Sequence, residues 1–159
     1  MGSFGDACWL PGQARLIVSE DRGGGQNPNA GSMFTIRPDG SDRELLISAG
    51  QFGPAVNIGQ ILSSPDGSQL AFTVETPNQN GEFQFRSLYV QDIASGVRRQ
   101  IDVATGQEVS DLWWFEGGLA WRAVSIGQGP EYDGVEPFLI EVANLETGQT
   151  RLVYSSDAT

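Results

Sequence analysis

Residues 63–74 read SSPDGSQLAFTV, a Pro-Asp-Gly turn followed at once by an apolar, β-rich run. This order predicts a tight turn that opens into a strand. The same plan is present at 9–18 (WLPGQARLIV) and at 114–121 (WFEGGLAW). Leu16, Leu70 and Leu119 are then equivalent positions, and they recur at intervals of about 50 residues.

A second landmark lies downstream of each turn. Gly40, Gly96 and Gly148 each close a short apolar segment, and they recur with the same spacing. Each glycine is followed by another short strand pattern. Two landmarks with one period predict a threefold internal repeat.

Each repeat is expected to form four short antiparallel strands joined by Gly-containing turns. The first strand is expected at 7–10, 58–63 and 109–114, the second at 14–19, 69–74 and 119–125, the third at 33–37, 87–92 and 137–143, and the fourth at 43–47, 97–103 and 150–154. We expect one domain over 1–159, with repeats at about 4–50, 56–104 and 107–156. No stretch of twelve residues has a helical period, so helices should be few or absent.

The middle repeat carries a family resemblance. Ser64-Pro65-Asp66-Gly67-Ser68-Gln69-Leu70-Ala71-Phe72, followed by the segments 88–92 and 95–96, resembles the TolB-type (WD40-like) β-propeller repeat. The resemblance implies an all-β fold of three four-stranded antiparallel blades. The first repeat has Pro11-Gly12 in place of the turn Asp, and the third has Glu116-Gly117-Gly118. The resemblance also suggests a periplasmic or extracellular location, but the chain as given has no signal-peptide pattern, so the compartment stays unknown.

Three blades are fewer than the four to eight of a propeller ring. An open arc would leave two apolar sheet faces in water. One interpretation is that two copies form a homodimer that completes a six-bladed ring, the blade number that the resemblance implies. The other is that the remaining blades lie elsewhere in a longer protein.

The composition excludes several classes of function. The net charge is −11 with a pI near 4.2, which argues against binding nucleic acid or an anionic membrane surface. The absence of His removes the usual general base and the usual metal ligand. Cys8 is the single cysteine, so no intrachain disulfide can form, and its apolar neighbours predict a buried structural thiol. No segment approaches the roughly 18 apolar residues of a membrane helix. We expect no cofactor and no bound metal.

The long connections between the second and third strands are the candidate binding face, because long loops on a rigid scaffold are where binding residues usually lie. They are expected at 20–31, 75–86 and 126–136, at the end of the sheets opposite the short hairpins. The candidate partner-binding residues are Glu20, Asp21, Glu75, Glu82, Phe83, Phe85, Glu131, Tyr132 and Asp133. They could attract a basic protein segment, a cationic ligand or a metal ion. Alternatively, they are solvated loops that keep an acidic protein soluble, and Phe83 and Phe85 lengthen a strand.

Other conspicuous residues have structural explanations. Trp113 and Trp114 are neighbours in an expected strand and should point to opposite faces. Packing between adjacent blades explains both of them and Trp121 without a bound sugar. Asp39 to Asp42 lacks the further oxygen ligands of a calcium loop, so a hairpin turn is favoured there.

The sequence therefore predicts a non-catalytic propeller module that serves as a protein-binding or assembly scaffold through an acidic loop face. The alternative is the propeller portion of a larger secreted or periplasmic hydrolase, where it would gate access of the substrate. TolB-type repeats occur beside peptidase domains, which supports that alternative. This chain has no Gly-x-Ser-x-Gly nucleophile motif, so we expect it to carry no hydrolase chemistry of its own.

Overall fold

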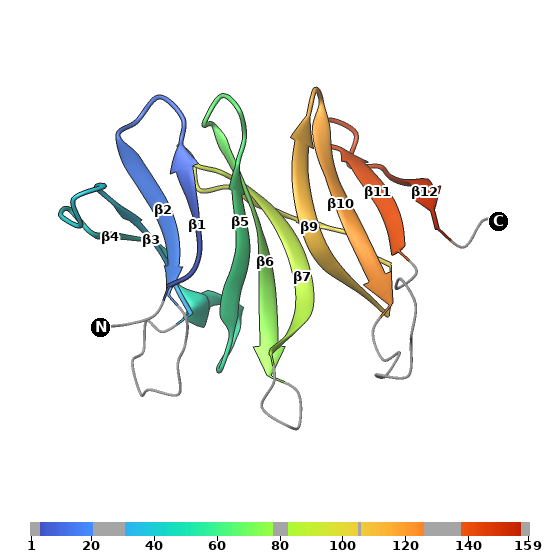
Figure 1. The fold of residues 1–159 in the computed structure, drawn as a ribbon, viewed down its shortest axis with the longest axis horizontal. Coiled ribbons are helices and arrows are strands. Elements are labelled where there is room, and N and C mark those ends of the chain that lie inside the picture. Colours follow the sequence, from blue (N-terminus) through green and yellow to red (C-terminus); the bar gives the residue numbers. More distant parts are fainter. Residues whose placement is uncertain (1–3, 21–30, 78–82, 105, 126–137, 157–159) are drawn as a thin grey trace. The chain divides into compact units, whose positions relative to one another are not determined.

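The computed structural model describes residues 4–20, 31–77, 83–104, 106–125 and 138–156, and these form three four-stranded antiparallel sheets (Figure 1). Sheet 1 contains β1 (Phe4–Leu10), β2 (Arg15–Glu20), β3 (Met33–Ile36) and β4 (Glu44–Ile47). Sheet 2 contains β5 (Asn57–Ser63), β6 (Gln69–Pro77), β7 (Phe83–Asp92) and β8 (Arg98–Ile101). Sheet 3 contains β9 (Gln107–Phe115), β10 (Gly118–Ser125), β11 (Phe138–Asn144) and β12 (Thr150–Ser155).

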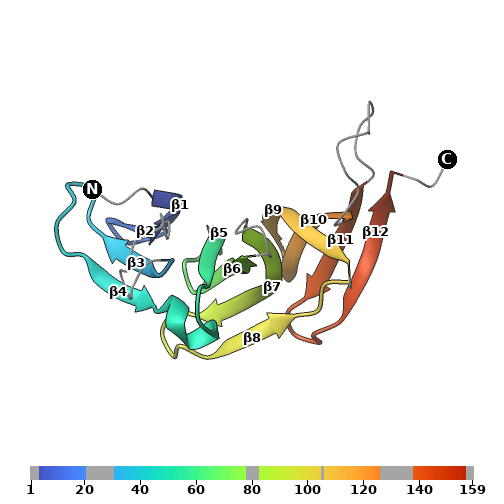
Figure 2. The same cartoon turned by 90° about the horizontal axis from the view of Figure 1, so that it is seen from below.

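In every sheet the strands follow one another in chain order. The predicted all-β fold with three four-stranded sheets is confirmed. In the described part of the chain the single helical segment is the short 3-10 helix η1 (Ala49–Phe52), which connects β4 to β5 (Figure 2). No helix in that part is long and apolar enough to cross a membrane.

The chain divides into two compact units, Met1–Gln100 and Ile101–Thr159. The first unit contains sheets 1 and 2, and the second contains sheet 3; the boundary falls inside β8. A single domain over the whole chain stays a prediction.

The Pro65-Asp66-Gly67 turn joins β5 to β6. Asp66 Oδ1 accepts hydrogen bonds from Ser64 Oγ at 2.6 Å and from the Ser68 amide at 3.0 Å. These bonds, the one from Ser64 above all, lower the pKa of Asp66 to about 2. Gly67 adopts φ +72°, and a Cβ there would lie 2.7 Å from the backbone oxygen of Pro11 in the β1–β2 turn. Glycine meets both demands because it tolerates positive φ and carries no side chain.

Sheets 1 and 2 pack face to face around one apolar core. Sheet 1 contributes Leu10, Ile17, Met33 and Ile47, and sheet 2 contributes Ile58, Ile61, Leu70, Phe72 and Val74. Phe52 of η1 closes one edge, with its ring centroid 6.0 Å from that of Phe72 and 5.2 Å from that of Tyr89. This burial of aliphatic and aromatic surface is what holds the two sheets together.

Three hydrogen bonds accompany this core. The Ile61 amide donates to Asp6 Oδ2 at 2.6 Å, and Ser63 Oγ donates to the backbone oxygen of Trp9 at 2.6 Å. The Ile58 amide donates to the backbone oxygen of Gly31 at 2.9 Å. Two of them run from β5 to β1 and the third runs from β5 to Gly31, just before β3, so they fix the register of the two sheets as well as their contact.

Sheet 3 has one buried face. Leu119, Trp121 and Ala123 of β10 are each 0% exposed. The Trp121 indole nitrogen donates to Glu141 Oε2 on β11 at 3.0 Å, and the two residues are direct cross-strand partners. The polar edge of the indole is therefore paired where it is buried, as buried tryptophans usually are.

The hairpin of β6 and β7 is longer than expected. Glu75 pairs with Phe85 and Pro77 pairs with Phe83, so the ladder continues beyond the predicted end of each strand. The expected loop at 75–86 is therefore reduced to the connection at 78–82. The alternation of Phe83 and Phe85 suits a pleated strand, and this is the second of the two interpretations that their spacing allowed.

Candidate functional site

The predicted acidic face is described by the structure only at its base. Glu20 is the last residue of β2 and Glu75 lies near the end of β6; both strands end at the same end of the first unit (Figure 1). Phe83 and Phe85 are strand positions in β7. The remaining candidates, Asp21, Glu82, Glu131, Tyr132 and Asp133, lie outside the described residues.

Glu20 is engaged within sheet 1. Its Oε2 lies 2.9 Å from Nη2 of Arg43, and the Arg43 guanidinium stacks over the Phe34 ring at 3.8 Å from the centroid. Glu20 is 8% exposed, so its carboxylate is largely withdrawn from solvent. The structure therefore assigns Glu20 an ion pair within the sheet, while Glu75 is half-buried on β6 opposite Asn57.

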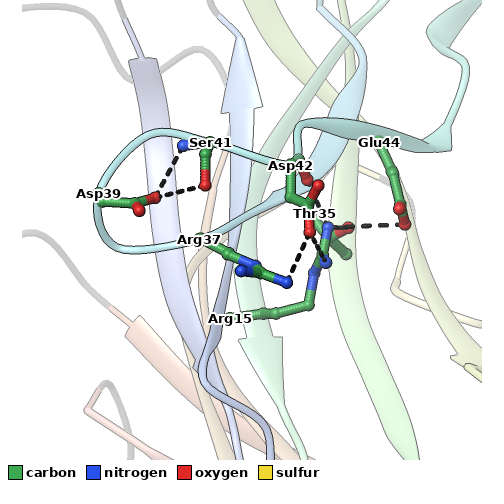
Figure 3. A network of polar contacts seen from close by, with 7 residues as sticks. All are labelled: Arg15, Thr35, Arg37, Asp39, Ser41, Asp42 and Glu44. Carbon is green, nitrogen blue, oxygen red and sulfur yellow. Dashed lines mark hydrogen bonds and ion pairs between the residues drawn. The ribbon is translucent and has the colours of Figure 1, made fainter.

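At the opposite end of sheet 1, a polar network ties the two hairpins together (Figure 3). Arg15 Nη2 donates to Thr35 Oγ1 at 3.0 Å and to the Asp42 backbone oxygen at 2.5 Å. Arg37 Nη2 lies 2.9 Å from Asp42 Oδ2, and Arg15 Nη2 lies 3.5 Å from Glu44 Oε2. Both guanidiniums already have carboxylate partners, so the adjoining surface hollow of about 460 Å³ is no ready anion site.

The turn at 39–42 is a hairpin turn, as predicted. Asp39 Oδ1 accepts from the Ser41 amide at 2.9 Å and from Ser41 Oγ at 2.7 Å. The bond from the Ser41 hydroxyl is the main reason that the pKa of Asp39 lies below its usual value. Within the residues that the structure describes, no group of three His, Cys, Asp or Glu side chains is arranged to hold a metal ion.

Cys8 sits at the edge of the closed core. It is half-buried and packs beside the cluster shared by sheets 1 and 2. Burial raises the pKa of its thiol, against the opposing effect of hydrogen bonding with Ser63. A protonated, packed thiol agrees with the structural role that its neighbours in the sequence predict.

The most distinctive surfaces are two sheet faces with exposed apolar side chains. The first, the Trp9 face of sheet 1, consists of Ala7, Trp9, Leu16, Val18, Phe34, Ile36 and Leu45. Trp9 is 57% exposed and Leu45 is 51% exposed, whereas Val18 and Phe34 of the same face are buried, with Phe34 beneath the Arg43 guanidinium. The face looks away from the core, which the opposite side of sheet 1 forms with sheet 2.

The second is the Trp113 face of sheet 3. It consists of Asp111, Trp113, Phe115, Ala120, Arg122, Phe138, Ile140, Val142 and Tyr154. Trp113 and Phe115 are each 46% exposed, and Tyr154 is 50% exposed. Trp114 lies on the other face, so the predicted opposition of Trp113 and Trp114 is confirmed. Arg122 lies 4.7 Å above the Phe138 ring and 3.7 Å from Asp111 Oδ2.

The strand pairing within each sheet allows the three sheets to be aligned, so that each position in one sheet has an equivalent position in the others. Leu16, Leu70 and Leu119 are each the second residue of the second strand, as the repeat predicts. By this register Trp113 corresponds to Cys8, Phe115 to Leu10, Ile140 to Met33, Tyr154 to Ile47 and Asp111 to Asp6. In the same way Trp9 corresponds to Ser63, Leu16 to Leu70, Val18 to Phe72, Phe34 to Tyr89 and Ala7 to Ile61.

Sequence reasoning did not identify these two faces as candidate surfaces. A signal for them is present, since Asp-x-Cys-x-Leu at 6–10 and Asp-x-Trp-x-Phe at 111–115 stand at corresponding places in the first and third repeats. Identifying it requires the strand register, because only cross-strand pairing shows that the two segments hold equivalent places in their sheets.

Comparison with known proteins identifies the fold and leaves the family open. No protein-family model matches the chain, and no curated protein matches it. Among solved structures it is similar to an acylaminoacyl peptidase from Pyrococcus horikoshii, with a TM-score of 0.59 and 11% sequence identity. The match covers 98% of this chain and 25% of that chain, so this chain spans a quarter of its length. That peptidase has a β-propeller domain, and the likeness shows a propeller-like fold for this chain.

Proposed function

We propose that the chain is a non-catalytic β-propeller module that serves as an assembly and protein-binding scaffold. One observation carries the proposal. The Trp113 face exposes apolar side chains at positions that line the interface between sheets 1 and 2, and the Trp9 face exposes Trp9 and Leu45. Exposed apolar sheet faces of this kind mark interaction surfaces. The SSPDGSQLAF turn and strand support the finer assignment of the repeats to the TolB type.

The oligomeric state tests the assembly function. Light scattering coupled to size exclusion, over a range of protein concentrations, should give a discrete species heavier than the 17.1 kDa chain. The physical reason is that association removes apolar surface from water at both faces. A clean monomer at every concentration would contradict the assembly function.

The acidic loop face is the proposed binding surface for a basic protein segment. An oligoarginine peptide is a suitable probe, with affinity measured by calorimetry at low and high salt. The triple variant Asp21→Asn, Glu82→Gln and Asp133→Asn should bind it about tenfold more weakly, because a single ion pair at a protein surface contributes up to about 1 kcal/mol. The matched control removes three charges elsewhere, with Asp102→Asn, Glu116→Gln and Glu146→Gln. If both variants lose the same affinity for the peptide, the loss is explained by the lower net charge of the protein and not by the acidic loop face.

A second candidate is the propeller portion of a larger hydrolase. The likeness to a peptidase four times as long as the matched region favours it, since the match covers 25% of that chain. In that case the two exposed faces are covered by further blades of the same polypeptide. The chain on its own should then be a monomer or an aggregate of undefined size, whereas the assembly function predicts one discrete oligomer.

A further inference from the structure

The closed interface between sheets 1 and 2 is the reference for a docked pair of sheets in this protein. Sheet 1 presents the side that carries Leu10 and Ile47, and sheet 2 presents the side that carries Leu70 and Phe72. We call the side of sheet 1 that faces sheet 2 the leading side of a sheet. We call the side of sheet 2 that faces sheet 1 the trailing side. The two sides are different surfaces, so the contact is heterologous.

Of the two exposed faces, one corresponds to a leading side and the other to a trailing side. The Trp113 face of sheet 3 has the register of the leading side, with Phe115 at the position of Leu10 and Tyr154 at the position of Ile47. The Trp9 face of sheet 1 has the register of the trailing side, with Leu16 at the position of Leu70. A single chain therefore carries both halves of one further contact.

The charged groups on the Trp9 face are compatible with docking. Arg43 stacks over Phe34, and Glu20 pairs with Arg43. In the closed interface Arg98 stacks in a similar way, 4.5 Å above Phe52 and 5.6 Å above Phe72. An arginine over an aromatic ring is thus part of the interface that is already formed.

The polar groups of the closed interface also have counterparts. Asp6 accepts the backbone amide of Ile61 in the bulge of β5. Asp111 has the position of Asp6 on the Trp113 face, and Ala7 has the position of Ile61 on the Trp9 face. The Ala7 amide already donates to Asp6 Oδ1 of its own chain at 2.8 Å, so the correspondence is one of position and not of a free donor. The Asp111 carboxylate is already beside Arg122, which offsets its charge in a docked pair.

We propose that the Trp113 face of one copy docks on the Trp9 face of a second copy, in the manner of sheet 1 on sheet 2. This inference rests on the assembly function and names its partner and its geometry. The occupant is a second copy because the chain supplies both complementary faces. Two such contacts join two copies when the rotation closes, and repeated contacts form an open array when it does not.

Complementation between two variants tests the pairing. Trp9→Arg places a charge on the Trp9 face alone, and Trp113→Arg places one on the Trp113 face alone. Val97→Arg is the matched control, because Val97 is 68% exposed and lies in the β7–β8 turn. Near-ultraviolet circular dichroism and the urea unfolding midpoint report whether each variant is folded, and Trp9→Ser and Trp113→Ser provide a second pair.

Each single variant should be a monomer at concentrations where the wild type and Val97→Arg are assembled. A mixture of the two variants should form a heterodimer, because the intact Trp113 face of one meets the intact Trp9 face of the other. This single contact should require about tenfold more protein than the closed assembly.

Other outcomes overturn the pairing. If folded Trp9→Arg assembles with itself, the Trp113 face pairs with its own copy, and if folded Trp113→Arg does so, the Trp9 face pairs with its own copy. If the folded variants stay monomeric when mixed, the two faces do not dock. A wild-type monomer would instead contradict the assembly function itself, so the two failures are distinguishable.

Discussion

The leading side of sheet 1 and the Trp113 face of sheet 3 occupy the same place in their repeats and meet different surroundings. Leu10 and Ile47 are 3% and 1% exposed in the closed core, whereas their counterparts Phe115 and Tyr154 remain about half exposed. The two compared residues of the closed side are aliphatic, whereas their exposed counterparts are aromatic. Aromatic residues with polar edges suit surfaces that are hydrated when free and buried when docked. Equivalent positions of the repeat therefore form a buried contact in sheet 1 and an exposed surface in sheet 3.

The largest expected difference is in the aromatic residues. Phe72→Ala should lower the free energy of unfolding by about 3–5 kcal/mol, because it leaves a cavity in the closed core. Phe115→Ala should change it by less than about 0.5 kcal/mol, since surface truncations have small effects. Urea unfolding at a protein concentration low enough to avoid assembly measures both values. Equal losses would mean that the Trp113 face is as firmly packed in the free chain as the closed core.

The next difference concerns the two aspartates at corresponding positions. Asp6→Ala removes the acceptor for the Ile61 and Ala7 amides, and should cost about 1–3 kcal/mol because Ile61 is buried. Asp111→Ala should cost less than about 0.5 kcal/mol in the free chain but should weaken assembly. Urea unfolding gives the first quantity, and light scattering gives the second. A loss of stability in Asp111→Ala that matches that of Asp6→Ala would break the comparison between the two faces.

The smallest expected effect lies on the buried side of sheet 3. Burial raises the pKa of Glu141 above its ordinary 4.5, against the hydrogen bond from Trp121. The folded protein then holds this proton more tightly than the unfolded chain, so stability from this group is fully present below pH 4.5 and declines as the pH rises through the raised value. Glu141→Gln should match the wild type under acidic conditions and should be more stable than it at neutral pH. Thermal unfolding across this range tests the sign, with Glu146→Gln as control; a variant less stable at neutral pH would contradict it.

Strand positions were predictable because the turns carry strong local signals. Asp66-Gly67 and the glycines at 40, 96 and 148 mark hairpins through their backbone preferences, and every predicted strand is present. The ends of β6 and β7 were not predictable from the sequence, because the pairing of Phe83 and Phe85 depends on a partner strand. Propensity alone leaves such positions open.

The site was less predictable than the fold. Acidic residues in long connections are visible in the sequence, but the ion pair of Glu20 with Arg43 depends on the tertiary structure, since Arg43 reaches Glu20 across β3. Simple alternation places Asp111, Trp113 and Phe115 on one face of β9, and Ala7 and Trp9 on one face of β1. Alternation does not tell which of the two faces another sheet covers, because that depends on contacts between residues far apart in the sequence.

Gly67 has a further consequence for the spacing of the sheets. Its Cα approaches the Pro11 backbone so closely that a methyl group would lie 2.7 Å from the Pro11 oxygen. At the hairpin end, therefore, two turns touch through bare backbone, while at the other end the Ile58–Gly31 hydrogen bond holds the sheets. A side chain at position 67 would push sheets 1 and 2 apart at the hairpin end, while the Ile58–Gly31 hydrogen bond holds them at the other end. The close approach of sheets 1 and 2 at their hairpin end thus depends on a residue that belongs to neither strand ladder.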